Sequence, residues 1–148
     1  MAKYEYTCDE DTLCGINIPK ELDNLTELEQ KHIPVISTPE QVKRNQSFEL
    51  TVEVGELREH PNEPAHFIEW IEVYSGDTFL FRTTLAGSLS KAKVTVSVKL
   101  THAHGPLKAW AKCNIHGLWE GEKDIEVEEV SRLFHQKQQK YKRITCVV

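Results

Sequence analysis

Apolar and polar residues alternate with a period of two through the middle of the chain. Residues 48–54 and 94–100 place an apolar side chain at every second position. This is the period of a β-strand with one buried and one exposed face. Shorter or less regular strand patterns follow at residues 66–74, 79–85, 107–114 and 125–128. The segment 66–74 also fits helical spacing, but its short length and its aromatic and β-branched residues favour a strand.

Turn signals such as Ser75-Gly76-Asp77 and Gly105-Pro106 separate these segments. Several short strands with turns between them predict an all-β fold, an antiparallel β-sandwich of roughly 100 residues. We expect residues 1–30 to form an N-terminal arm, residues 31–128 the sandwich domain, and residues 129–148 a C-terminal tail. A helical stripe predicts a short helix in that tail, formed by Val130, Leu133, Phe134, Tyr141 and Ile144.

The composition excludes several classes of protein. Of the 148 residues, 39% are hydrophobic and 28% charged, and the net charge is −5. No apolar run approaches the roughly 20 residues of a transmembrane helix, and the N-terminus lacks the apolar segment of a secretory signal. The negative net charge argues against a nucleic-acid partner. We therefore expect a cytoplasmic protein that binds neither membrane nor nucleic acid.

Four histidines and one cysteine stand out as candidate metal ligands. His32 lies in a loop-like stretch before the first clear strand, and His60 and His66 bracket a loop with two prolines. Cys113 and His116 form a Cys-x-x-His turn at the end of a strand. Imidazole and thiolate are strong ligands for late first-row metals, and proline stiffens a ligand-bearing loop. Singly, each piece has an ordinary explanation, but together they favour a metal site.

The number of ligands discriminates between metals. Zinc takes four protein ligands in structural sites and usually three in catalytic sites, so five candidates exceed both. Blue copper needs two histidines, a cysteine and usually an axial methionine, but the only methionine is Met1. Iron, with five protein ligands and an open sixth position, fits best.

Three motifs carry a resemblance to a known family: KHIP at 31–34, HPNEPAH at 60–66 and CNIHGLW at 113–119. They resemble the signature motifs of superoxide reductases, and more closely the one-iron, neelaredoxin-like class of the desulfoferrodoxin family. The resemblance spans residues 29–125 and implies an immunoglobulin-like sandwich. Two-iron relatives carry an N-terminal CxxC knuckle, which Cys8 and Cys14 do not form. One iron (Fe2+/Fe3+) per chain is therefore expected, and the remaining cysteines are expected to be thiols rather than disulfides.

The resemblance also implies the site. The equatorial ligands would be His32, His60, His66 and His116, and the axial ligand Cys113. His102, His104 and His135 lie outside the motifs and are interpreted as surface residues.

The activity implied is one-electron reduction of superoxide to hydrogen peroxide, without release of oxygen. Lys31, next to a ligand, would attract the anion and organise a proton-donating water. The backbone N–H groups of Ile115 and His116 would donate to the Cys113 sulfur. An electron donor such as rubredoxin and a homo-oligomer (tetramer or dimer) complete the expectation.

One position departs from the family pattern. The family places a glutamate directly before the lysine, where it can occupy the sixth position, but this chain has Gln30 there and Glu29 one residue earlier. Either the sixth position lacks a carboxylate, or Glu29 takes it. Two other functional classes also stay open: an electron carrier with a filled sixth position, and an immunoglobulin-like interaction module without iron.

Overall fold

The computed structural model describes residues 11–129. Its elements in chain order are β1 (Ile16–Asn17), α1 (Glu27–His32), β2 (Pro34–Ser37), β3 (Gln41–Lys43), β4 (Ser47–Val54), β5 (Ile68–Ser75), β6 (Thr78–Thr84), β7 (Lys93–Lys99), β8 (Leu107–Cys113), β9 (Gly117–Lys123) and β10 (Glu126–Glu128). The predicted all-β class is confirmed. The helix predicted for the C-terminal tail lies outside the described residues.

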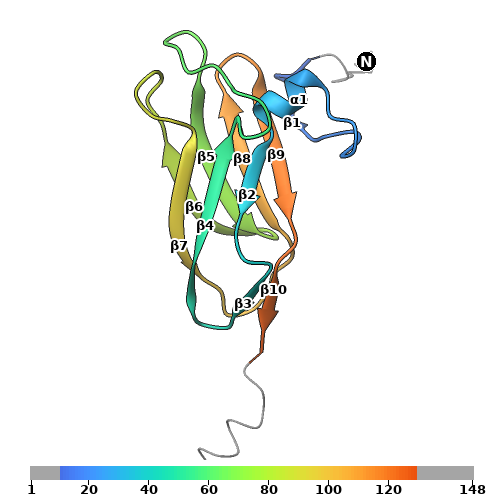
Figure 1. The fold of residues 1–148 in the computed structure, drawn as a ribbon, viewed down its shortest axis with the longest axis vertical. Coiled ribbons are helices and arrows are strands. Elements are labelled where there is room, and N and C mark those ends of the chain that lie inside the picture. The colour runs from blue at the N-terminus through green and yellow to red at the C-terminus, as the bar shows by residue number, and fades with distance from the viewer. Residues whose placement is uncertain (1–10, 130–148) are drawn as a thin grey trace, which may run out of the picture.

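Two main sheets form the body of the molecule (Figure 1). One has the strand order β1-β9-β8-β5-β6 and the other the order β2-β4-β7, while β10 and β3 form a separate pair. Most neighbours are antiparallel, but β1 runs parallel to β9 and β10 runs parallel to β3. The predicted antiparallel arrangement therefore holds for most strand pairs, but not for these two. Each joins segments far apart in sequence, so no hairpin imposes an antiparallel direction.

The two most regular sequence patterns form neighbouring strands. In the pairing of β4 with β7, Leu50 lies opposite Val96 and Val52 opposite Val94. Leu50 and Val52 are fully buried, as are Ile71, Val73 and Leu107 of the other sheet. These side chains belong to one apolar core cluster drawn from both sheets. The alternation therefore identifies the core face of each strand correctly.

The mixed spacing of residues 66–74 has a structural cause. In the pairing of β5 with β8, the register shifts between Ile68 and Trp70. A bulge places an extra residue on one strand, so the period of two is interrupted there. The same strand carries a second register shift, between Val73 and Tyr74, in its pairing with β6.

The segment before β2 is helical rather than loop-like. Thr26 accepts a hydrogen bond from the Glu29 backbone N–H, and the Glu29 side chain accepts one from the Thr26 backbone N–H. This reciprocal capping box starts the short helix α1, which ends at His32. The expectation of a loop at His32 is therefore wrong. Within residues 11–129 no helix is long and apolar enough to cross a membrane.

Candidate metal centre

Helix α1 delivers His32 to one end of the two sheets. Nδ1 of the ring donates to the Leu28 carbonyl at 2.7 Å, one helical turn back. Because Nδ1 carries that hydrogen, Nε2 is the lone-pair nitrogen. The side chain is buried, with an exposed fraction of 1%. A hydrogen bond of this kind fixes both the tautomer and the orientation of a ligand histidine.

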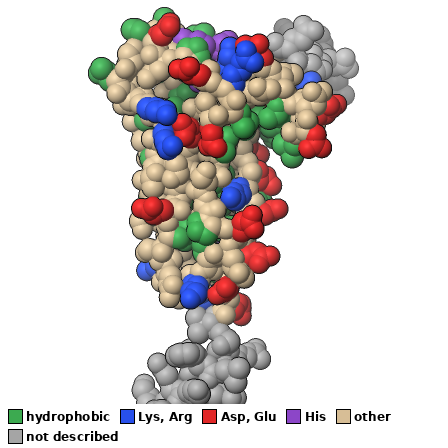
Figure 2. All heavy atoms as spheres, in the orientation of Figure 1, with side chains coloured by type: hydrophobic (Ala, Val, Ile, Leu, Met, Phe, Trp, Pro, Cys, Tyr) green, Lys and Arg blue, Asp and Glu red, His purple; other side chains and the backbone are tan. Residues whose placement is uncertain are grey.

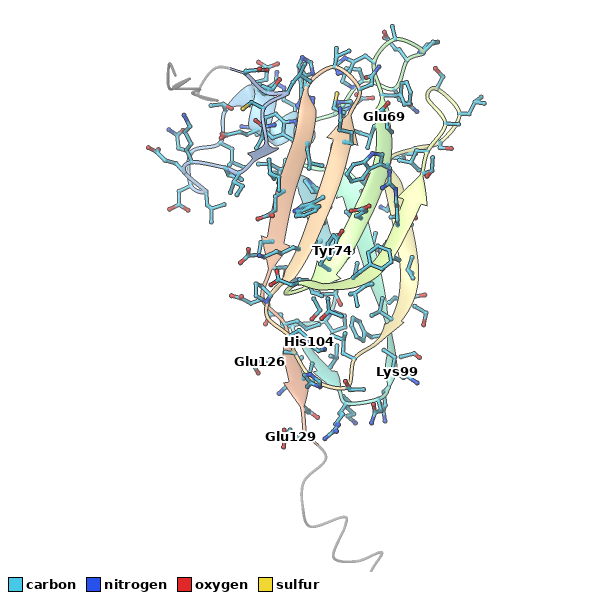
Figure 3. All side chains as sticks on the ribbon, turned by 180° about the vertical axis from the view of Figure 1, so that it is seen from behind. Glu69, Tyr74, Lys99, His104, Glu126 and Glu129 are labelled. Carbon is cyan, nitrogen blue, oxygen red and sulfur yellow. The ribbon has the colours of Figure 1, made fainter. Side chains whose placement is uncertain are left out.

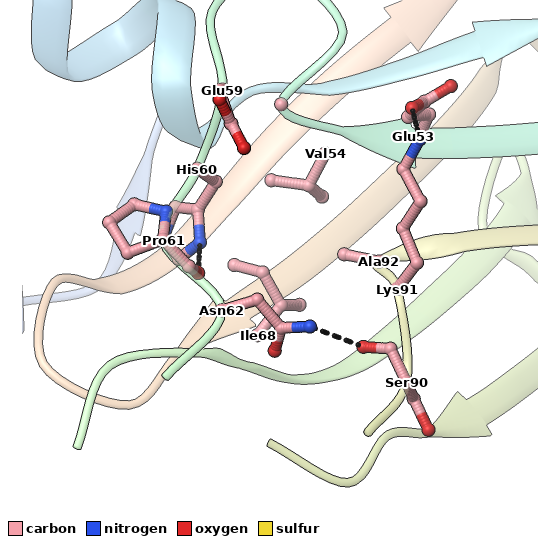
Figure 4. Close-up of a pocket in the computed structure, with 11 residues that line it drawn as sticks. Glu53, Val54, Glu59, His60, Pro61, Asn62, Ile68, Ser90, Lys91 and Ala92 are labelled. Carbon is pink, nitrogen blue, oxygen red and sulfur yellow. Dashed lines mark hydrogen bonds and ion pairs between the residues drawn. The ribbon is translucent and has the colours of Figure 1, made fainter. Parts of the chain in front are cut away.

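The loop between β4 and β5 supplies two more histidines. Nδ1 of His60 donates to the Pro61 carbonyl at 2.6 Å, which again leaves Nε2 as the lone-pair nitrogen (Figure 4). His66 is held by a reciprocal backbone pair with Glu63, at 2.9 and 3.0 Å. The Nε2 atoms of His60 and His66 are buried and have no hydrogen-bond partner within residues 11–129. Leaving a buried polar atom unpaired costs about 1–3 kcal/mol. Two such nitrogen atoms in one cluster therefore indicate a site that binds a cation.

The turn between β8 and β9 brings in Cys113 and His116. Cys113 is fully buried, and its Sγ lies 3.7 Å from Nδ1 of His116. The same Nδ1 lies 3.1 Å from Nε2 of His32. Gly117, at a φ of +81°, closes the turn; a Cβ atom there would meet the Thr12 carbonyl oxygen of the N-terminal arm. The nitrogen of His116 that lies near Sγ of Cys113 and Nε2 of His32 is thus Nδ1, not Nε2.

The four imidazoles form a closed ring around a common centre. Centroids of successive rings lie 4.6 Å apart for His32–His60, 4.8 Å for His60–His66, 4.9 Å for His66–His116 and 4.8 Å for His116–His32. Successive planes are inclined by 66–83°, while the planes of His32 and His66, across the ring, differ by only 26°. Donor atoms of His32, His60, His66 and Cys113 all lie within 4.8 Å of one another. The structure thus brings together all five side chains that the sequence analysis selects.

Burial keeps three of the imidazoles, those of His32, His60 and His66, in the neutral form at neutral pH. Burial lowers the pKa of His32 to about 4, and the neighbouring imidazoles add to the effect against the hydrogen bond to Leu28. Burial likewise lowers the pKa of His60 to about 4, and it lowers that of His66. A neutral imidazole has a free lone pair, which is the form that binds a metal. His32, His60 and His66 therefore present lone pairs that can bind a cation at neutral pH.

Burial and hydrogen bonding act in opposite directions on the pKa of the Cys113 thiol. Burial raises the pKa of the Cys113 thiol, while hydrogen bonds from the backbone N–H groups of Ile115 and His116 lower it. The burial that disfavours a bare thiolate becomes tolerable when a metal ion pairs with the sulfur. The donor set of four nitrogens and one sulfur fits a transition metal that takes five protein ligands.

Two residues to which the sequence analysis gives no role hold the site together. The Asn114 side chain accepts from the Phe67 N–H at 3.0 Å and donates to the Ala65 carbonyl at 3.0 Å, so the Cys113 turn is tied to the His66 loop. The Trp119 indole Nε1–H donates to the His116 carbonyl at 2.9 Å. Their place in the third motif is visible in the sequence, but these partners exist only in the fold.

The three residues before His32 differ in their environment. The Glu29 carboxylate is engaged in the capping box, and the Gln30 amide donates to the Leu25 carbonyl at 3.0 Å. Both side chains thus bond toward the start of α1, away from His32 at its end. Lys31 forms an ion pair with Glu27 at 2.9 Å, and its charge also lowers the pKa of His60 and His66. Of the three, Lys31 is the one whose charge reaches the histidines.

The surroundings of the centre are open and charged. Figure 2 shows histidine side chains at the surface of the end that carries α1, with Lys or Arg and acidic side chains beside them. A cavity of about 320 Å³ lies beside His60, lined on its far side by Glu53, Ser90 and Lys91 (Figure 4). The centre is therefore close to solvent although most of its candidate ligand side chains are buried.

The other candidate positions lie apart from this centre. His102 and His104 are exposed, as predicted, with ring centroids 4.1 Å apart. Figure 3 shows His104 toward the end of the molecule that carries Glu126, opposite α1. His135 lies outside the described residues. Cys14 is disulfide-bonded, so the expectation of thiols is wrong at this position.

Comparisons with known proteins identify relatives that cover the part of the chain that carries the candidate centre. The family model described as desulfoferrodoxin matches residues 24–122. A putative superoxide reductase of Methanocaldococcus jannaschii is 42% identical over 118 residues, which cover 78% of this chain and 97% of that protein. Neelaredoxin of Megalodesulfovibrio gigas is 33% identical over 117 residues, covering 67% of this chain and 89% of that protein.

Solved structures give the same result. A superoxide reductase (neelaredoxin) from Ignicoccus hospitalis superposes with a TM-score of 0.66 at 37% identity, covering 76% of this chain and 95% of that one. A putative superoxide reductase from Thermotoga maritima superposes with a TM-score of 0.62 at 37% identity, covering 68% and 89%.

Proposed function

The chain belongs to the desulfoferrodoxin family, and from this premise we propose that it is a superoxide reductase with a mononuclear iron centre. The observation that carries the proposal is the convergence of four imidazoles and one cysteine, with two buried Nε2 atoms that have no hydrogen-bond partner in the described part of the chain. Iron in the Fe2+/Fe3+ states, one per chain, fits five protein ligands better than zinc or blue copper does.

The proposed reaction consumes one superoxide, one electron and two protons, and it yields one hydrogen peroxide. When bound, the iron would supply that electron and be oxidised from Fe2+ to Fe3+. The ligands would be Nε2 of His32, His60 and His66, Nδ1 of His116, and Sγ of Cys113. For His32 and His60 this choice of nitrogen follows from their Nδ1–H bonds to the Leu28 and Pro61 carbonyls.

The protein's own groups would control how the substrate arrives and how charge is held. Lys31 places a positive charge close enough to act on His60 and His66, which favours approach of an anion. A solvent water beside its ammonium group would pass a proton to the reduced substrate. The N–H groups of Ile115 and His116 draw electron density from the Cys113 sulfur and so moderate its donation.

We propose that residues 31–128 form an immunoglobulin-like iron-binding domain, with residues 1–30 and 129–148 as flanking segments. The reaction also requires an electron donor that restores Fe2+, for which a small redox protein such as rubredoxin is the proposed class. A homo-oligomer, dimer or tetramer, is the proposed assembly.

The test combines metal analysis with product analysis. We expect about one iron per chain and a visible thiolate-to-iron band in the oxidised protein that is absent from Cys113→Ser. Superoxide should be consumed with formation of peroxide and without formation of oxygen. His102→Ala, at the opposite end of the molecule, is the matched control and should keep both properties. Iron without turnover would indicate an electron carrier, and a chain without iron an interaction module.

A further inference from the structure

Glu27 joins two cations that stand next to different ligand segments. Its Oε1 lies 2.9 Å from Nζ of Lys31 and 3.1 Å from Nη2 of Arg58. Lys31 directly precedes His32 on α1, and Arg58 lies two residues before His60 in the loop after β4. One carboxylate therefore bridges the two cations at the edge of the histidine ring. Of these three residues, only Lys31 lies in one of the three sequence motifs.

The three side chains are accessible to small anions. Their exposed fractions are 58% for Glu27, 32% for Lys31 and 50% for Arg58. Exposed ion pairs are weak because water and salt screen them. An anion that arrives from solvent can therefore compete with Glu27 for the same two cations. The bridge lowers the net charge of the group from +2 to +1.

The position of the bridge makes this competition relevant to the site. The positive charge of Lys31 contributes to the lowered pKa of both His60 and His66. The hydrogen bond from Lys31 and the charge of Arg58 hold the pKa of Glu27 below its ordinary value, so its carboxylate is ionised at neutral pH. Every small anion that approaches the ring from this side meets a permanent competitor of its own charge.

We propose that Glu27 is a built-in counter-anion at the entrance of the metal centre and that Arg58 is a second substrate-attracting cation beside Lys31. This inference rests on the proposed function for the identity of the substrate, the superoxide anion. Glu27 weakens the attraction of anions to the entrance, and its displacement from the two cations accompanies anion entry.

The bridge could instead have a purely structural role, and the two roles predict opposite effects of losing Glu27 on anion binding. Glu27 lies in the first turn of α1, where a carboxylate also interacts favourably with the helix dipole. If the bridge served to hold α1 against the loop of His60, its loss would disturb the ligands and weaken anion binding. If Glu27 is a counter-anion, its loss strengthens anion binding and leaves the ligands in place. The sign of the effect separates the two roles.

The experiment measures azide binding to the oxidised iron-loaded protein through the change in its visible spectrum. We expect Glu27→Gln to bind azide about two- to fivefold more tightly than the wild type. Glu40→Gln, which makes the same charge change in the segment between β2 and β3, is the matched control and should match the wild type. Arg58→Met should bind azide more weakly by a similar factor. The rate of superoxide association should change in the same directions.

A double mutant isolates the bridge itself. If Glu27 acts by occupying Arg58, the gain from Glu27→Gln should shrink when Arg58→Met is also present. Loss of iron or weaker azide binding in Glu27→Gln would overturn the proposal, as would equal azide affinities of Glu27→Gln and Glu40→Gln. Azide binding does not require turnover, so a protein that holds iron but fails to reduce superoxide would refute the proposed function while still deciding the role of Glu27.

Discussion

The indole of Trp119 lies flat against the imidazole of His32, with ring centroids 4.9 Å apart and planes inclined by 23°. Trp119 is on β9 and almost fully buried, whereas His32 ends α1. The contact therefore links the five-stranded sheet to the helix that delivers a proposed ligand. The indole also holds the His116 carbonyl, so a single side chain contacts two of the five proposed ligands.

We expect Trp119→Phe to loosen the centre without unfolding the protein. Phenylalanine keeps a ring against His32 but cannot donate to the His116 carbonyl, and the loss of that bond costs about 1 kcal/mol. Iron should dissociate faster to a chelator, while the free energy of unfolding falls slightly. Trp110→Phe is the control, because its indole donates to Glu120 on the same sheet, away from the ligands. Equal iron loss from the two variants would contradict the role given to Trp119.

We expect Asn114→Ala to weaken metal binding more than it weakens the fold. The change removes two hydrogen bonds that tie the Cys113 turn to the His66 loop, and it should cost about 1–3 kcal/mol of stability. Loss of such supporting bonds typically lowers metal affinity by about 10- to 100-fold.

Thr51→Ala is the control for Asn114→Ala. The Thr51 hydroxyl forms a hydrogen bond of 2.7 Å with that of Thr95, between β4 and β7, in a sheet whose strands carry neither Cys113 nor His116. The variant should lose some stability and keep its iron affinity. If metal affinity fell equally in both variants, the effect of Asn114 would be a general loss of stability.

How far the sequence predicts the fold depends on the length and regularity of each segment. The alternation over 48–54 corresponds to β4, since seven residues of one period leave little ambiguity. The helix α1 has six residues, too few for a helical period, and only the Thr26 and Glu29 capping pair marks it. The parallel pairing of β1 with β9 depends on tertiary contacts between segments about 100 residues apart, which no local pattern encodes.

The candidate site also has features that the sequence predicts and features that only the fold determines. The fold brings together His60, His66, Cys113 and His116, which the sequence motifs mark as candidate ligands. They could be predicted because histidine and cysteine are the residue types that bind transition metals. The choice of ring nitrogen depends on backbone carbonyls in the folded loops, and it is not readable from spacing. The bridge from Lys31 to Arg58 spans 27 residues and depends on how α1 packs beside the loop after β4.

Lys31→Met should slow superoxide association by about tenfold at low ionic strength. The physical reason is the loss of a positive charge that acts on the histidine ring. Because salt screens that charge, the wild-type rate should fall more steeply with ionic strength than the variant rate. Pulse radiolysis at several salt concentrations measures both slopes, with Lys43→Met on β3 as the control. Parallel slopes for wild type and Lys31→Met would remove Lys31 from this role.

Glu53 gives a pH dependence that is independent of the metal. Hydrogen bonds from Lys93 and Lys91 hold its pKa below the ordinary value of 4.5. As the pH falls, the unfolded chain therefore takes up this proton before the folded chain does. The ion pairs stabilise the fold fully above pH 4.5, and this stabilisation is lost as the pH falls through the lowered pKa of Glu53. Both lysines are largely exposed, which limits the contribution to about 0.5–1 kcal/mol.

Denaturant unfolding of Glu53→Gln at pH 7 and at pH 3.5 checks this sign. The variant should be less stable than the wild type at pH 7, and the difference should be smaller at pH 3.5. Glu49→Gln lies on the same strand and has no ion pair within residues 11–129, so it should show little difference at either pH. A difference that grows on acidification would contradict the assignment.

This chain has an amide, Gln30, and not a carboxylate directly before Lys31. Glu29 is engaged in the capping box, so Glu29→Ala should destabilise α1 by about 1 kcal/mol and leave azide binding to the oxidised protein unchanged. Gln30→Glu should act differently, because a carboxylate cannot donate to the Leu25 carbonyl and is released from that contact. A released carboxylate next to Lys31 competes with azide, so the azide affinity should fall. Spectroscopic titration of the two variants decides between them: weaker binding in Gln30→Glu alone is the expected result. If Glu29→Ala instead changed the azide affinity, Glu29 would be the residue that reaches the sixth position.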